Sequence, residues 1–216
     1  VTLASLKQNR TRTVVTIIGI MLSAAMICAS TTFVASMQNF VLRYTIYKTG
    51  DWHGAVYDAA YKDYEDIGGS GKVASATYAQ TLGYARINSA NERKPYLYVL
   101  GGDATSGYFE TMPVHLTAGE LPKSSSEIIL PEHLATNGKV SYKIGDTVTF
   151  DVGDRILDGK RLGQIDPFFT YDSEIQAEVK NDEKLENTVA RTYTVVGMYE
   201  RPGFENTDAP GYTPLT

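Results

Sequence analysis

The residues from Thr13 to Leu42 contain no charged side chain and no proline. Within this run, Val14–Met37 gives 24 almost continuously apolar residues, about 36 Å of helix for a hydrocarbon core of about 30 Å. The alternative is a buried core helix of a soluble protein. Such a helix usually keeps a polar face, whereas this run offers only small hydroxyl and glycine residues. It therefore predicts a transmembrane helix with its stalk over residues 13–42.

The charges around this run are distributed unevenly. Lys7, Arg10 and Arg12 precede it without any acid, and the first of the 25 Asp and Glu is Asp51. The positive-inside rule then places residues 1–12 in the cytoplasm, as a short amphipathic segment, and residues after about 43 outside the cell membrane. The nearest rival, a cleaved signal peptide, has a shorter apolar run.

The rest of the chain, residues 43–216, is long enough for one extracellular domain. Its patterns predict an α+β fold: an N-terminal transmembrane helix, then a mixed α+β domain with a small β-rich inserted lobe at roughly 111–192. Short helices are expected at 61–67, 106–110 and 131–136, the last with Pro131 at its first position. Strands are expected at residues 52–57, 73–78, 82–87, 96–100, 127–130, 147–152 and 192–199.

Composition excludes several classes of function. The net charge of −5 opposes nucleic-acid binding, and the single cysteine excludes a disulfide framework. The three histidines are far apart in the sequence, and no nucleophile, zinc or dinucleotide motif occurs. The glycine-rich turn at 68–72 lacks the P-loop spacing. We therefore expect no catalytic residue, cofactor or metal, and no enzyme activity in this chain.

One apolar island interrupts the charged segment 153–190 and contains Phe168, Phe169 and Tyr171. Exposed aromatic side chains often mark binding surfaces, so these three are candidates for an outward contact. The alternative is that they pack onto their own hairpin, and the sequence leaves both readings open.

Several motifs resemble a known family. The basic start and first apolar run, LASLKQNRTRTVVTIIGIMLS, are similar to the beginning of FtsX-like and MacB-like ABC transporter permeases. The following region resembles the MacB-like core domain, and the segment 47–57 looks like permeases of Gram-positive bacteria. The elements that carry the resemblance occur in the family's order: Gly107-Tyr108-Phe109, Leu116–Pro122, Glu127–Pro131, Ile144–Val148 and Tyr193–Met198.

This resemblance implies a permease subunit whose extracellular domain moves when a separate cytoplasmic ATPase binds and hydrolyses ATP. The implied partners are that ATPase, a second permease copy or homologue, and the lipid bilayer. The implied task is export or extrusion of a peptide, lipid or antimicrobial-like substrate. Because such permeases carry three further spans, we expect the gene product to continue beyond Thr216. The alternative is a single-pass, membrane-anchored binding or sensor domain without an ATPase.

Overall fold

The computed structural model describes residues 10–57 and 59–216. It divides into two compact units, one ending at Ile46 and the other comprising Tyr47–Thr216. We call the second unit the sheet domain and describe each unit by itself. The expected amphipathic segment at 1–12 lies largely outside the described residues.

The first unit is the greater part of helix α2, Arg10–Thr49. Its 40 residues span about 60 Å, and none of them is buried. Hydroxyl groups along it are bonded to the preceding turn, as Ser23 Oγ donates to the Gly19 carbonyl at 2.8 Å and Ser30 Oγ to the Met26 carbonyl at 2.8 Å. An apolar surface that satisfies its own polar groups is what a lipid environment requires, and the buried-core alternative does not hold.

This helix is longer than the predicted 13–42. It already includes Arg10, the first described residue, and continues past Arg43 and Lys48 to Thr49. Charged residues mark where a helix leaves lipid, but Arg and Lys are good helix formers and do not end it. Gly50 follows with a left-handed φ of 97°, and this conformation ends the helix.

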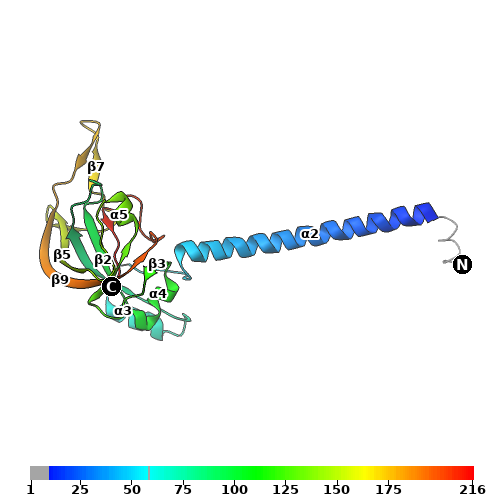
Figure 1. Cartoon of the computed structure of the whole chain (residues 1–216), viewed down its shortest axis with the longest axis horizontal. Coiled ribbons are helices and arrows are strands. Elements are labelled where there is room, and N and C mark those ends of the chain that lie inside the picture. The colour runs from blue at the N-terminus through cyan, green and yellow to red at the C-terminus, as the bar shows by residue number, and fades with distance from the viewer. Residues whose placement is uncertain (1–9, 58) are drawn as a thin grey trace. The chain divides into compact units, whose positions relative to one another are not determined.

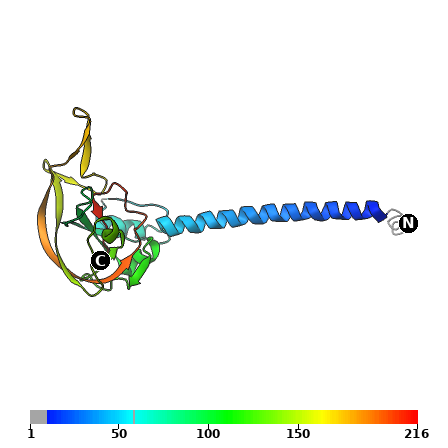
Figure 2. The ribbon, with the colours of Figure 1, turned by 45° about the horizontal axis from the view of Figure 1, so that its top comes forward.

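The sheet domain contains a mixed sheet and a separate two-stranded one. The main order is β10-β2-β1-β5-β9-β3, with β4 parallel to β9 and β6 beside β5, whereas β7 and β8 pair only with each other. Figure 2 shows β5 and β9 as a long curved pair. The strands are β1 Ala79–Arg86, β2 Tyr96–Gly102, β3 Leu116–Gly119, β4 Glu127–Pro131, β5 Thr147–Leu157, β6 Lys160–Leu162, β7 Phe169–Asp172, β8 Ala177–Lys180, β9 Lys184–Tyr199 and β10 Gly211–Tyr212.

Four short helical segments accompany the sheet: α3 Tyr61–Gly69, η1 Ala104–Ser106, α4 Tyr108–Thr111 and α5 His133–Asn137. Strands and helices are mixed along the chain without βαβ repeats, which confirms the predicted α+β class. In Figure 1, β7 and its hairpin project from the rest of this domain.

The core lies where alternate strand residues meet α5. Along β5, Val148, Phe150 and Val152 are buried, while Thr149 and Asp151 between them are exposed. Leu97 and Leu134 join the same cluster. This period of two is the reason the sequence identified the central strands.

Two predicted strands are wrong. Residues 52–57 and 73–78 form no strand. Tyr57 is 83% exposed and Val73 39%, whereas Tyr78 is partly buried. β-Branched and aromatic content suits a strand only where a neighbouring strand can pair with it, and neither segment is paired.

The predicted helices at 106–110 and 131–136 also differ from the structure. Gly107, at φ 77°, separates η1 from α4. Pro131 ends β4 opposite Tyr199, and α5 begins only at His133. A proline φ is tolerated at a strand end as well as at a helix start.

Candidate functional site

The three predicted contact residues lie at the base of the β7–β8 hairpin and along it. Phe168 is only 3% exposed and packs edge-to-face on Tyr96, with ring centroids 5.8 Å apart. Of the two readings that the sequence left open, Phe168 therefore follows inward packing, although against Tyr96 of the sheet and not only against its own hairpin. Phe169 is partly buried, whereas Tyr171 is 67% exposed. A contact role stays a prediction for Tyr171.

A buried ion pair fixes the base of this hairpin. Arg155 and Glu183 have no exposed side-chain surface, and their Nε–Oε1 and Nη2–Oε2 distances are both 2.7 Å. Arg155 also donates to the carbonyls of Gly163 at 2.9 Å and Asp166 at 3.0 Å. Burial, together with the charge of Glu183, raises the pKa of the adjacent Tyr96 to about 12. The charged segment 153–190 is thus tied to the core at the base of its hairpin.

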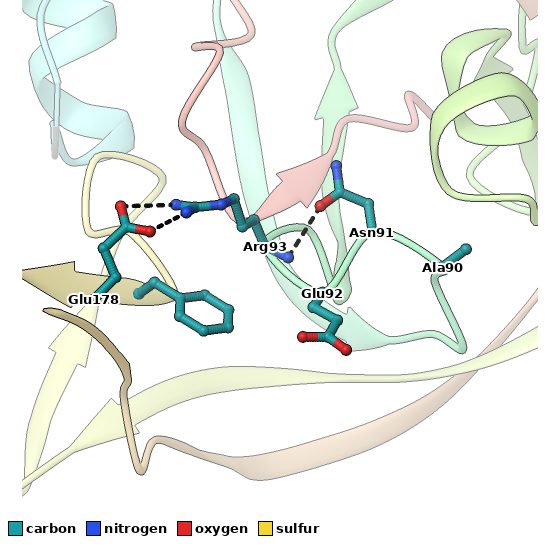
Figure 3. A pocket seen from close by; sticks show the side chains of 6 residues that line it. Ala90, Asn91, Glu92, Arg93 and Glu178 are labelled. Carbon is teal, nitrogen blue, oxygen red and sulfur yellow. Dashed lines mark hydrogen bonds and ion pairs between the residues drawn. The ribbon is translucent and has the colours of Figure 1, made fainter.

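A cavity of about 330 Å³ lies between the hairpin and the turn before β2. Figure 3 shows the two terminal nitrogens of Arg93, Nη1 and Nη2, donating to the two carboxylate oxygens of Glu178. The Arg93 guanidinium also lies 5.4 Å from the centroid of Phe169. Hydrogen bonding to Arg93 lowers the pKa of the Glu178 carboxyl. This exposed ion pair, which we call the clasp, joins the hairpin to the turn before β2. The residues that line the cavity include charged groups but no nucleophile.

A second cavity, of about 210 Å³, adjoins the last turn of α2 within the sheet domain. The ring of Tyr47 stacks on His115, with centroids 3.9 Å apart and planes 7° from parallel. His115 Nε2 donates to the Tyr47 carbonyl at 2.7 Å. The Tyr47 hydroxyl donates to Glu200 Oε2 at 3.0 Å, and this bond raises the pKa of Tyr47.

The chain leaves this helix along a defined path. The Asp51 amide donates to the Thr111 carbonyl at 2.8 Å. A Cβ at Gly50 would lie 2.6 Å from the same carbonyl oxygen, so glycine is required there for close approach as well as for its positive φ. Residues 47–51 are therefore held by several contacts within the sheet domain.

The side chains that could bind metal are dispersed. Over residues 10–57 and 59–216, no three His, Cys, Asp or Glu residues form a group able to hold an ion. What the structure does show is two attachments to the main sheet of the sheet domain. One holds the end of α2 from Tyr47 onward, and the other holds the β7–β8 hairpin. Sequence reasoning missed both attachments, because Arg155 and Glu183 lie in a charge-rich segment and His115 had no motif around it.

Comparison with known families identifies one match. The profile of the MacB-like periplasmic core domain matches residues 13–216, which include most of α2 and the whole sheet domain. No curated protein matches the chain. The family match confirms the resemblance to the MacB-like core domain, and with the apolar helix it supports membrane anchoring of an extracellular-type domain. The likeness of residues 47–57 to permeases of Gram-positive bacteria stays a prediction. The chain therefore belongs to the MacB-like periplasmic core domain family, whose members are ABC transporter permeases of the MacB and FtsX type.

Proposed function

We propose that this chain is the N-terminal part of an ABC transporter permease subunit that couples ATP hydrolysis to motion of its sheet domain. A separate cytoplasmic ATPase supplies the hydrolysis, and a second permease copy or homologue completes the transporter. The chain itself is not an enzyme in this proposal. The substrate exported or extruded is a peptide, a lipid or an antimicrobial-like compound.

The proposed orientation follows from charge. Basic residues precede the apolar run and all acidic residues follow it, so the N-terminus is cytoplasmic and the sheet domain extracellular. The exposed apolar side chains along α2, such as Ile27 at 65% and Phe33 at 70%, suit contact with lipid.

One observation carries the proposal, namely the unbroken course of α2. The helix needs about 20 residues to cross a bilayer, and its remaining turns continue without interruption to Thr49. Its last residues, from Tyr47, already belong to the sheet domain. A continuous helix transmits displacement between its ends, whereas a flexible linker does not.

The test uses the native full-length protein solubilised in detergent. We expect a nucleotide-binding subunit to be recovered with it, and ATP with vanadate to alter hydrogen exchange in the sheet domain. Gln38→Pro interrupts α2 beyond the first 20 apolar residues. The Gln38→Pro protein is expected still to bind the nucleotide-binding subunit but to show no change in hydrogen exchange with ATP and vanadate. Gln38→Ala is expected to retain both the binding and the exchange response. Recovery of no nucleotide-binding subunit would favour the single-pass binding or sensor domain.

A further inference from the structure

The loop between β9 and β10 has its first half against the last turn of α2. Glu200 accepts the Tyr47 hydroxyl hydrogen bond. A Cβ placed on Gly203 would overlap the Lys48 carbonyl oxygen, so loop and helix backbones are in direct contact. The cavity of about 210 Å³ lies along this contact and reaches Glu205.

The middle of the loop is attached to the rest of the sheet domain through the Glu205 carboxylate, and its end through the Pro210 carbonyl, which accepts the Tyr96 amide at 3.2 Å. Glu205 has no exposed side-chain surface. Its Oε1 accepts from Lys94 Nζ at 3.2 Å and from His133 Nε2 at 2.8 Å. Its Oε2 accepts the Thr213 amide at 3.0 Å. Arg201 Nε lies 3.6 Å from Oε1.

These partners come from separate parts of the fold. Lys94 precedes β2, His133 begins α5, and Thr213 follows β10. One side chain therefore joins the loop to a strand at the edge of the sheet, to its neighbour and to the helix over the core. The remaining partner, Arg201, belongs to the loop itself and also donates to the Glu205 carbonyl at 3.2 Å.

Such an arrangement is costly in free energy. Burial by itself raises the pKa of the Glu205 carboxyl, but the hydrogen bonds and charges of His133 and Lys94 outweigh it and hold the pKa below its usual value. A buried ion pair seldom improves on apolar packing of similar volume. What a carboxylate with four partners provides is a single fixed geometry.

We propose that Glu205 is a positioning residue for coupling, which fixes the loop at 200–205 on the sheet so that the last turn of α2 moves together with β2, β10 and α5. The inference rests on the proposed function, because it assigns one route by which motion of α2 enters the sheet, beside the contacts of Tyr47 with His115 and of Asp51 with Thr111. Without the carboxylate the loop yields, and displacement of the helix end no longer reaches β2, β10 and α5 through this loop.

The first test is hydrogen exchange of the full-length protein in detergent, read at the amides of residues 47–51. Glu205→Gln keeps the side-chain volume and is expected to speed their exchange at least tenfold. The control is Glu178→Gln, which removes an exposed paired carboxylate of the sheet domain far from this loop in the sequence. It is expected to leave these amides within twofold of wild type. An equal rise in both variants, or no rise in Glu205→Gln, would overturn the positioning role.

A second variant keeps the test decisive if Glu205→Gln does not fold. Lys94→Met leaves His133, Arg201 and the Thr213 amide on the carboxylate, so this variant is expected to fold. Because the loop has lost one of its four partners, exchange at residues 47–51 is expected to rise at least threefold. Unchanged exchange there, in a folded Lys94→Met protein, refutes the proposal.

The second readout separates this inference from the proposed function. With the ATPase partner present, ATP and vanadate are expected to change exchange at residues 47–51 and at 205–213 in wild type, but only at 47–51 in Glu205→Gln. A response at both sites in Glu205→Gln refutes the role of Glu205. A wild type with no response in any sheet-domain peptide refutes the proposed function, and the exchange comparison without nucleotide then decides on Glu205 alone.

Discussion

Breaking the ion pair beneath the β7–β8 hairpin is expected to destabilise the sheet domain strongly. Glu183→Gln leaves the Arg155 guanidinium with no carboxylate and no access to water, because neither side chain has exposed surface. An uncompensated buried charge costs about 3–5 kcal/mol. In a domain of 170 residues, Tyr47–Thr216, each kcal/mol lowers the melting temperature by about 2–4 °C. The expected fall is therefore about 6–20 °C.

The assay is thermal unfolding of the detergent-solubilised chain, followed by near-ultraviolet circular dichroism of its tyrosines. The double variant Arg155→Met, Glu183→Leu removes both charges, and it is expected to recover at least half of the loss, because apolar replacement of a whole buried pair is often neutral. A loss below about 1 kcal/mol for Glu183→Gln, or a double variant as unstable as the single one, would refute the assignment of this pair as a buried anchor.

Three further results are expected. Because the pKa of Glu205 is lower in the folded state than in the unfolded chain, its contribution to stability is present above the unfolded value of about 4.5 and is lost as pH falls; melting temperatures measured from pH 7 to pH 3 should fall less steeply in Glu205→Gln. Gly203→Ala forces a Cβ against the Lys48 carbonyl, so amides at 47–51 should exchange at least tenfold faster, and unchanged exchange would contradict the packing. Arg93→Gln removes an exposed clasp, so β7–β8 amides should exchange about threefold faster with an unaltered melting temperature, whereas a large fall in melting temperature would show a role in the core.

The parts of this fold that were predictable are those governed by periodicity and hydropathy. α2 was evident because a long uncharged run allows few structures, although its end at Thr49 depends on Gly50 and on the contact of Asp51 with Thr111. The central strands were evident because their buried residues alternate. Residues 52–57 show the limit, since a strand-like composition does not supply a pairing partner.

The site was less accessible because its residues depend on distant partners. Arg155 and Glu183 lie in a segment whose charge density is typical of exposed loops, yet the fold brings them together in the interior. Phe168 lies in the same segment and is buried at the base of the hairpin, whereas Tyr171, three residues later, is exposed. Glu205 lies shortly after Pro202 and Gly203, which are typical of an exposed turn, and no pattern in the adjacent sequence indicates a buried carboxylate. Each of these cases requires contacts between residues far apart in the sequence.

The account depends most on α2 crossing the membrane with the sheet domain outside, and cysteine labelling in intact cells tests this directly. With Cys28 replaced by Ala, Tyr171→Cys places a thiol on a side chain that is 67% exposed, and Ser5→Cys places one before the helix. A membrane-impermeant maleimide is expected to label Tyr171→Cys in intact cells and Ser5→Cys only after permeabilisation. Labelling of Ser5→Cys in intact cells, with Tyr171→Cys protected until permeabilisation, would contradict the account.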